Sequence, residues 1–226
     1  YPRWPQRWPT TWIRGVAFSL LLNPLTRWMS RARVTGREQL TGECGPLLFV
    51  SNHVAMVDQS VILAALPLRF RRKLAIAMEA EKLWGWRHPP KGAGLFARII
   101  GLIRYAMVVA LFNVFPLPQK SGFRKSFAFA GESMDRGYSV LVFPEGRRTP
   151  DGEMHKFREG IGVLAKQLGV KVVPLRIDGL FGLKQRRKYF ARSGEVMVTI
   201  GEPLSFNGEG DAAAITRRLE QSVKSL

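Results

Sequence analysis

The stretch that decides the fold runs from Leu47 to Asp58 and reads Leu-Leu-Phe-Val-Ser-Asn-His-Val-Ala-Met-Val-Asp. Its first four residues are apolar and typical of a buried strand, and the composition from Asp58 to about Leu66 favours a helix that Pro67 ends. On one continuous helix, His53 and Asp58 would point roughly 140° apart and could not form a hydrogen bond. We therefore place His53 in the turn between the strand and the helix, and Asp58 on the first turns of the helix.

This turn carries two candidates for the helix cap, Ser51 and Asn52. If the carboxylate of Asp58 holds the neutral imidazole of His53, one ring nitrogen is fixed as a donor and the other is free to accept a proton from a hydroxyl. The pair therefore predicts general base chemistry suited to acyl transfer to an alcohol. The alternative for this motif alone is a turn histidine with satisfied hydrogen bonds and a solvated carboxylate.

A second polar segment follows another strand-like run, Ser139 to Phe143. It covers residues 144–152 and reads Pro-Glu-Gly-Arg-Arg-Thr-Pro-Asp-Gly, a composition typical of a turn. Loops at strand ends commonly carry function, and the planar guanidiniums of Arg147 and Arg148 match phosphate oxygens in bidentate fashion. The segment predicts an anion site, and the alternative is a solvated turn with surface arginines.

The two motifs, in this order and about ninety residues apart, resemble the glycerolipid acyltransferase family, the PlsC-type 1-acylglycerol-3-phosphate acyltransferases. Residues 52–58 match the family's first block, and residues 143–149 match its phenylalanine-proline-glutamate-glycine-threonine-arginine-serine block. Residues 156–160 resemble the segment that opens the next helix, and residues 172–174, Val-Val-Pro, match the last block. The resemblance covers roughly residues 33–205.

This resemblance implies an O-acyltransferase of phospholipid biosynthesis. Such an enzyme moves a fatty acyl group from acyl-coenzyme A or acyl-carrier protein to a lysophospholipid hydroxyl, above all that of 1-acylglycerol 3-phosphate, giving phosphatidic acid. The acyl thioester is a substrate, and no cofactor or metal is implied. The resemblance makes His53 the general base and Asp58 the group that orients the imidazole and stabilises its cation.

The second motif supplies the implied substrate-binding residues. Arg147 stands where the family usually has threonine, so Arg148 corresponds to its substrate-binding arginine. Glu145 is expected to position the acceptor or fix an arginine, and Gly146 to give the backbone room. Residues 172–174 are expected to shape the site.

One block departs from the family. Its second block normally ends in an isoleucine-aspartate-arginine tail that helps to hold the acceptor phosphate, whereas residues 114–119 read Val-Phe-Pro-Leu-Pro-Gln here. The arginine is missing, and Lys120 and Arg124 are candidates to replace its charge. The alternative is a lipid acceptor without a phosphate.

Composition restricts the partners. Against 17 Asp and Glu stand 35 Lys and Arg, a formal charge of +18 that predicts an anionic membrane surface as a partner. A length of 226 residues with 46% hydrophobic content predicts one domain with a substantial core and excludes disorder. The single cysteine excludes an internal disulfide, and three scattered histidines match no metal-site spacing.

Two alternatives come from other classes of protein, and the sequence argues against the second of them. A basic chain that carries tryptophans could be a non-enzymatic adaptor at a membrane surface. Nucleic-acid binding is not expected, because the aromatic residues are not interleaved with the lysines in a recognisable module.

The N-terminal segment suits a membrane interface. Residues 1–10 alternate Trp, Pro and Arg and predict an irregular arm or linker, and residues 12–29 predict an amphipathic helix broken at Pro24. We expect an interfacial segment at 1–32 and an acyltransferase-like domain at 33–226. Because the sequence starts at Tyr1, a fused upstream domain that hands over the acyl donor is a hypothesis.

A second apolar segment covers residues 95–117. Arg98 and Arg104 interrupt it, so interfacial insertion is favoured over a membrane span, with an ordinary core helix as the alternative. Trp84 and Trp86, just before Pro89 and Pro90, predict an interfacial loop. Together these segments predict a membrane-associated protein, peripheral or monotopic, on the cytoplasmic face.

The remaining pattern alternates strands and helices, which predicts an α/β fold with one mixed, mostly parallel sheet flanked by helices. The expected strands are residues 73–78, 139–143, 170–177 and 195–200, and the expected helices are residues 123–136, 160–168 and one from about Asp211 to Lys224. The basic run at 184–188 is expected to be a solvated or headgroup-facing loop.

Overall fold

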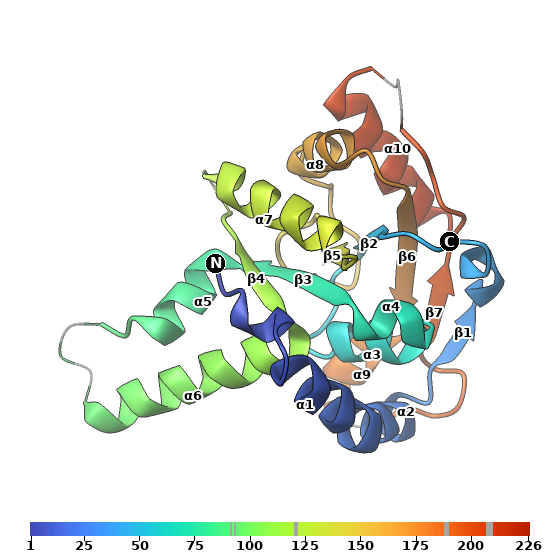
Figure 1. Ribbon diagram of the computed structural model, residues 1–226. Coiled ribbons are helices and arrows are strands. Elements are labelled where there is room, and N and C mark those ends of the chain that lie inside the picture. Colours follow the sequence, from blue (N-terminus) through green and yellow to red (C-terminus); the bar gives the residue numbers. More distant parts are fainter. Residues whose placement is uncertain (91, 93, 120–121, 188–189, 207–209) are drawn as a thin grey trace.

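The computed structural model describes residues 1–90, 92, 94–119, 122–187, 190–206 and 210–226. Within these residues the chain forms one sheet (Figure 1). Its strands are β1 (Arg33–Thr35), β2 (Leu48–Ser51), β3 (Leu74–Glu79), β4 (Val114–Leu117), β5 (Ser139–Val142), β6 (Val172–Asp178) and β7 (Met197–Ile200). Their order across the sheet is β1-β7-β6-β2-β5-β3-β4.

The sheet is mixed and mostly parallel. Strands β6, β2, β5, β3 and β4 are parallel to one another, whereas β7 pairs with β6 in antiparallel fashion and β1 is parallel to β7. The expected α/β fold with a single mixed sheet is therefore confirmed. Parallel strands place their carboxyl ends at one edge of the sheet, and this edge carries the site described below.

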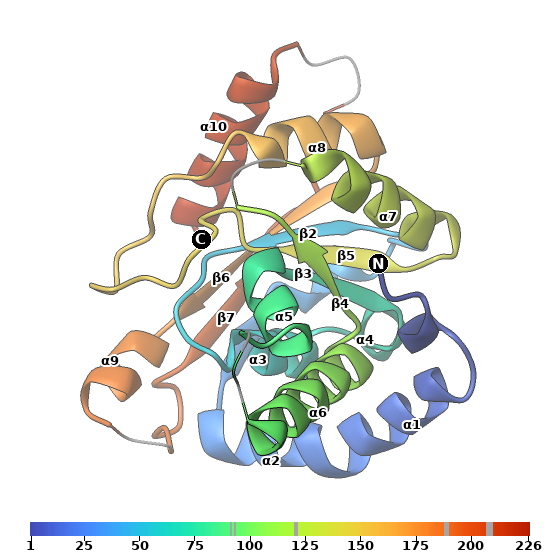
Figure 2. The ribbon, with the colours of Figure 1, turned by 90° about the vertical axis from the view of Figure 1, so that its left-hand side faces the viewer.

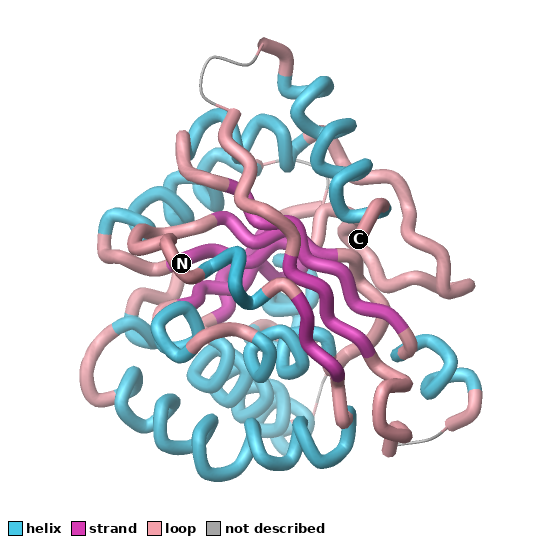
Figure 3. The backbone as a smooth tube through the Cα atoms, turned by 90° about the vertical axis from the view of Figure 1, so that its right-hand side faces the viewer, coloured by secondary structure: helices cyan, strands magenta, loops and turns pink. Residues whose placement is uncertain are grey.

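Helices cover both faces of the sheet. They are α1 (Thr10–Ala17), α2 (Asn23–Ser30), α3 (Asp58–Ala65), α4 (Leu68–Arg72), α5 (Ala80–Arg87), α6 (Leu95–Phe112), α7 (Phe123–Asp135), α8 (Gly160–Leu168), α9 (Leu180–Gln185) and α10 (Ala212–Lys224), with short 3₁₀ or π turns η1 (Trp4–Gln6), η2 (Phe18–Leu22) and η3 (Arg37–Leu40). Helices α7, α8 and α10 lie above the sheet in Figure 2, and α1, α2 and α6 lie below it. Figure 3 shows the strands passing between these two helical layers.

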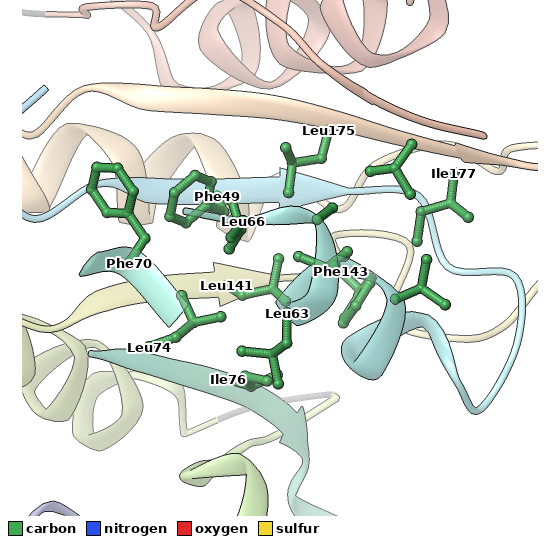
Figure 4. Packing of buried hydrophobic residues seen from close by; sticks show 14 of the residues in the cluster. Phe49, Leu63, Leu66, Phe70, Leu74, Ile76, Leu141, Phe143, Leu175 and Ile177 are labelled. Atoms are coloured by element: carbon green, nitrogen blue, oxygen red, sulfur yellow. The ribbon is translucent and has the colours of Figure 1, made fainter. Parts of the chain in front are cut away.

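The core explains why the central strands read as continuous apolar runs. All four residues of β2 and all four of β5 are buried, since helices cover both faces of these strands. On the face covered by α3, the cluster contains Phe49 of β2, Leu141 of β5, Leu175 of β6, and Leu63 and Leu66 at the helix (Figure 4). Burial of large aliphatic and aromatic side chains of this kind stabilises the fold by about 1.5–3 kcal/mol per side chain.

The expected secondary structure agrees with the observed elements over β2, β3, β5, β6, β7, α3, α7, α8 and α10, with boundaries shifted by one or two residues in most of them. The expectation for residues 95–117 is wrong in one respect. The helix α6 ends at Phe112, Asn113 adopts a left-handed conformation with φ of 49°, and β4 follows. The side-chain amide of Asn113 donates to the carbonyl oxygen of Leu74 at 2.9 Å. Pro116 is tolerated because β4 is an edge strand.

Helix α6 is apolar, yet Val109 is its one buried residue. By length and composition alone, this helix of 18 residues could cross a membrane, and 6% of it is buried in the protein. Its exposed side chains include Leu95, Phe96 and Ile103. The expected loop at Trp84 and Trp86 is wrong, because both residues belong to α5, which packs along α6.

The N-terminal residues lie against the domain. The expected irregular arm instead contains the turn η1 and contacts α7, where Arg3 forms an ion pair with Glu132 at 2.7 Å and Gln6 donates to Ser133 at 3.1 Å. The expected break at Pro24 is a short π-helical turn, η2, that joins α1 to α2 without interrupting the helical path. A π turn is one of the known ways in which a helix accommodates a proline.

Candidate functional site

The two polar motifs meet at the carboxyl edge of the sheet. Strands β2 and β5 are parallel neighbours, so the loops that follow them begin side by side. The amide of Thr149 donates to the carbonyl of His53 at 2.9 Å, and the amide of His53 donates to Glu145 Oε1 at 2.7 Å. Segments that are about ninety residues apart in the chain are thereby joined backbone to backbone and backbone to side chain.

The side chains of His53 and Asp58 form a hydrogen bond. His53 Nδ1 lies 2.7 Å from Asp58 Oδ2, with the ring in the turn after β2 and the carboxylate on the first residue of α3. Because a carboxylate accepts, the neutral ring carries its proton on Nδ1, and Nε2 is left as an acceptor. No described residue forms a hydrogen bond with Nε2. The imidazole side chain is 18% exposed and lines a cavity.

Asp58 is fully buried and held by backbone amides. Its Oδ2 accepts from Val54 N at 2.6 Å and from Ala55 N at 3.0 Å, in addition to the bond from His53. The positive end of α3 further favours a negative charge at this position. The carboxylate therefore has one position, and the imidazole is oriented by it.

Neither Ser51 nor Asn52 caps α3, so this expectation is wrong. Ser51 is the last residue of β2, and the residue that precedes the helix is Val57. The side chain of Asn52 instead accepts from the amide of Ile177 at 2.8 Å and donates to its carbonyl at 2.9 Å. It ties the end of β2 to β6 and fixes the start of the turn that carries His53.

The imidazole also packs on an aromatic ring. The rings of His53 and Phe143 are stacked, with centroids 4.4 Å apart and planes at 26°. Phe143 directly follows β5, so the second motif supports one face of the imidazole while Asp58 fixes its edge.

Glu145 has a different environment from the one expected. Its Oε1 accepts from the amide of His53 and its Oε2 from the amide of His155 at 3.0 Å, and no described arginine contacts it. The side chain is 4% exposed, and this burial raises the pKa of Glu145 above its ordinary value, against the opposing effect of the two amides. Glu145 therefore joins three segments of backbone at the site.

Gly146 closes the turn after β5. Its amide donates to Phe143 O at 3.1 Å, and its φ of 71° lies in the left-handed region that favours glycine. A Cβ added here would lie 2.7 Å from Arg158 Nε, so the room that glycine provides is occupied by the guanidinium of Arg158. This contact places Arg158 beside the second motif.

A cavity of about 750 Å³ opens beside His53. Its wall combines apolar side chains from several elements with a cationic group of residues. The apolar part includes Met78, Val108, Phe112, Leu117, Phe127, Val142 and Leu164, and the cationic part consists of Lys82, Arg147, Arg148, Arg158 and Lys184. An apolar wall beside cations fits a ligand with a long hydrocarbon part and an anionic part.

The remaining residues that were predicted to bind or shape the substrate site differ in their positions. Arg147 and Arg148 are exposed at the cavity, and no described residue forms a hydrogen bond or ion pair with either guanidinium. Arg124 is exposed on α7 and is not part of the cavity wall. Lys120 lies outside the described residues. Residues 172–174 pack β6 against β2 and do not line the cavity.

Three cations of the wall were not predicted from the sequence. Arg158 lies in the segment 156–160 that resembles the family, and Lys184 is the first residue of the basic run. Both features of the sequence could have indicated a cation at the site. Lys82 on α5 had no signal in any of the four blocks. The described residues contain no group of three or more His, Cys, Asp or Glu side chains that could hold a metal ion.

Comparison with known proteins relates this chain to acyltransferases. The chain is 28% identical over 167 residues to human 1-acyl-sn-glycerol-3-phosphate acyltransferase beta, covering 74% of this chain and 53% of that protein. It is 27% identical to the lyso-ornithine lipid O-acyltransferase of Pseudomonas aeruginosa, covering 94% of this chain and 81% of that protein. The chain spans about half the length of several of the curated relatives it matches.

The fold is shared with a solved structure. The crystal structure of the 1-acyl-sn-glycerophosphate acyltransferase PlsC from Thermotoga maritima superimposes with a TM-score of 0.63 at 21% identity, covering 95% of this chain and 85% of that one. The family model described as Acyltransferase matches residues 31–178, which include both motifs and strands β2 to β6. The chain therefore belongs to the Acyltransferase family.

Proposed function

We propose that this chain transfers a fatty acyl group from an acyl thioester to the free hydroxyl of 1-acylglycerol 3-phosphate, giving phosphatidic acid. The observation that carries this proposal is the 2.7 Å bond between His53 Nδ1 and Asp58 Oδ2, which leaves Nε2 unbonded by described residues beside the cavity. The acyltransferase relatives support the same substrate class, since several carry 1-acyl-sn-glycerol-3-phosphate in their names.

The proposed chemistry needs one base and no covalent acyl-enzyme. His53 Nε2 removes the proton of the acceptor hydroxyl as its oxygen attacks the thioester carbonyl carbon. The tetrahedral intermediate then expels the thiolate by breaking the carbon–sulfur bond, and the imidazolium returns the proton to sulfur. The products are an ester and a free thiol. Asp58 stabilises the imidazolium, and general base catalysis of this kind contributes about 10²- to 10⁴-fold in rate.

The cationic part of the cavity wall is assigned to the acceptor phosphate. Arg148, with Arg147, has uncommitted donors and a planar geometry that matches phosphate oxygens. The apolar part of the wall, with Phe112, Phe127 and Leu164, is assigned to hydrocarbon chains. The donor is either acyl-coenzyme A or acyl-carrier protein, because both are anionic thioesters and both suit a chain of charge +18.

A second candidate is acylation of an acceptor without a phosphate. The arginine that the family resemblance would place in the block at residues 114–119 is absent, and one relative that aligns over 94% of this chain is named for a lyso-ornithine lipid. Both observations concern the acceptor and leave the roles of His53 and Asp58 unchanged.

Membrane association is part of the proposal. Exposed apolar side chains on α1, η2 and α2 include Trp12, Leu20 and Trp28, and α6, which packs along α1, exposes Phe96 and Ile103. Figure 2 shows α1, α2 and α6 on the same side of the sheet. An apolar surface of this kind in a basic chain fits the interface of an anionic bilayer, with peripheral or monotopic attachment at the cytoplasmic face.

An acceptor panel tests the proposed function. The purified protein is incubated in liposomes with a long-chain acyl-coenzyme A and equal amounts of 1-acylglycerol 3-phosphate, 1-acylglycerol and lyso-ornithine lipid, and the products are separated by mass spectrometry. We expect phosphatidic acid to form fastest. Preferential acylation of the acceptors without a phosphate favours the second candidate. If no acceptor reacts, the panel is repeated with acyl-carrier protein that bears an acyl group as the donor. Absence of any acylated product in that panel contradicts acyl transfer and favours the membrane adaptor.

A further inference from the structure

The family resemblance leaves one charge unexplained, because the block at residues 114–119 lacks the acceptor-binding arginine and ends in Gln119. Three of the four polar groups of Gln119 are engaged in the structure. Its amide N donates to Glu81 Oε1 at 3.0 Å, its carbonyl accepts from Arg158 Nη1 at 2.7 Å, and its side-chain amide donates to the carbonyl of Gly146. Gln119 therefore holds the loop after β4 against the second motif and supplies no positive charge.

Helix α9 also contacts the second motif. Gly179, with φ of 85°, forms the turn between β6 and α9, and a Cβ at this residue would lie 1.8 Å from the carbonyl oxygen of Glu195. Leu180 and Leu183 anchor α9 in the core. Phe181 then packs so closely on Gly152 that an added Cβ there would lie 2.7 Å from Phe181 Cδ1.

This docking brings Lys184 to the cavity. Its Nζ lies 3.5 Å from the carbonyl oxygen of Thr149 and 5.5 Å from the ring centroid of Phe181. No described carboxylate forms an ion pair with it. The amide of Thr149 in turn donates to the carbonyl of His53 at 2.9 Å, so one residue connects the ammonium to the backbone of the proposed base. A lysine ammonium carries three donors, and most of its capacity is uncommitted here.

We propose that Lys184 binds the phosphate of the lysophospholipid acceptor and replaces the arginine that is absent from residues 114–119. This inference rests on the proposed function. In 1-acylglycerol 3-phosphate, the phosphate is attached to the carbon next to the one that bears the reacting hydroxyl, so it must lie close to His53 when the hydroxyl contacts Nε2. Lys184, Arg147 and Arg148 line the same cavity as His53.

The acyl donor fits this place less well. In acyl-coenzyme A and in acyl-carrier protein, the whole pantetheine arm separates the phosphates from the thioester. When the thioester carbon lies at His53, the donor phosphates lie at the far end of that arm. The ammonium of Lys184 lines the same cavity as His53 and is joined to the His53 backbone through Thr149 alone, which favours the acceptor phosphate over the remote donor phosphates.

The test compares Lys184→Met with Lys184→Arg, using wild type and Arg187→Asn as references. Arg187 belongs to the same basic run but does not line the cavity, and asparagine is tolerated at its φ of 51°. KM is measured for 1-acylglycerol 3-phosphate, for 1-acylglycerol and for acyl-coenzyme A. Lys184 is exposed, so each variant is expected to fold, and circular dichroism checks this.

We expect Lys184→Met to raise KM for 1-acylglycerol 3-phosphate about tenfold, the size of one charge-assisted hydrogen bond, and to leave KM for 1-acylglycerol and for acyl-coenzyme A within about twofold. Lys184→Arg should restore most of the loss, and Arg187→Asn should behave as wild type.

Three results overturn the inference: an unchanged KM for the phosphorylated acceptor, an increase confined to acyl-coenzyme A, or an equal effect of Arg187→Asn. In each of these cases wild type still makes phosphatidic acid, so the proposed function stands. Absence of phosphatidic acid from wild type contradicts both the proposed function and the role of Lys184.

Discussion

Glu145 Oε1 lies 2.7 Å from the backbone amide of His53, and its Oε2 accepts from the amide of His155. A buried carboxylate thus joins the turn after β2 to the loop after β5 and to the segment that leads into α8. The position of the imidazole depends on this junction as well as on Asp58. The geometry assigns Glu145 to positioning the site through two backbone amides, no described arginine forms a hydrogen bond or ion pair with it, and its role in positioning the acceptor stays a prediction.

Glu145→Gln should change the pH dependence of stability. Burial raises the pKa of Glu145 in the folded state, so the stability contributed by its protonated form is fully present below the unfolded-state pKa and is lost as the pH rises through the folded-state pKa. Glutamine does not titrate. The free energy of unfolding of wild type minus that of Glu145→Gln should therefore fall as the pH rises from about 4 upward. Urea unfolding of both proteins across this pH range measures this difference. A difference that is constant or rises with pH would contradict a raised pKa of Glu145 in the folded state.

Asp58→Asn should lower kcat by about 10²-fold or more, because an amide offers one acceptor oxygen and an N–H₂ group that opposes the surrounding donors. The same mismatch should destabilise the fold by about 1–3 kcal/mol. Asp135→Asn is the control, since Asp135 is exposed at the end of α7. Steady-state kinetics and urea unfolding measure both effects. An Asp58→Asn variant with the kcat of wild type would show that the bond to His53 Nδ1 has no catalytic role.

Arg148→Gln should weaken binding of the phosphorylated acceptor. Loss of a charge-assisted hydrogen bond costs about 1.5–3 kcal/mol, which corresponds to about a 10- to 100-fold rise in KM for 1-acylglycerol 3-phosphate. KM for 1-acylglycerol should not change. Arg72→Gln, at an exposed arginine at the end of α4, controls for the loss of one positive charge. Equal effects on both acceptors would mean that Arg148 does not contact the phosphate.

Phe96→Asp should reduce binding to anionic liposomes by about tenfold or more, because the side chain is 78% exposed on α6 and its burial in a bilayer would be lost. Stability in solution should change little. Val163→Asp, at a 44% exposed residue on α8 across the sheet, should leave liposome binding as in wild type. Sedimentation with liposomes measures both. Equal binding by all three proteins would place the membrane contact elsewhere than on α6.

Local spacing was sufficient to predict the pairing of His53 with Asp58, because only a turn before the helix allows two residues five apart to meet. The boundary between α6 and β4 was not predicted, since residues 95–117 are apolar without a break in pattern and Asn113 alone marks the change. The cap was mispredicted because the side chain of Asn52 has a partner in β6 that is 125 residues away.

The cationic wall depends on tertiary packing in the same way. Lys184 reaches the cavity only because Gly179 turns the chain and Phe181 docks on Gly152, and both contacts join segments that are distant in the sequence. The N-terminal residues provide a further example, since the partners of Arg3 and Gln6 on α7 lie more than 120 residues away. Composition predicted a basic, membrane-directed chain, but could not say which cations converge on His53.

We propose His53 as the base in acyl transfer to 1-acylglycerol 3-phosphate. The most direct measurement is the rate of phosphatidic acid formation by wild type and by His53→Ala in anionic liposomes, followed by mass spectrometry, with liposome binding of both proteins measured in parallel. We expect product from wild type, a rate lower by about 10²- to 10⁴-fold in His53→Ala, and equal liposome binding. Equal rates of product formation by the two proteins would contradict it.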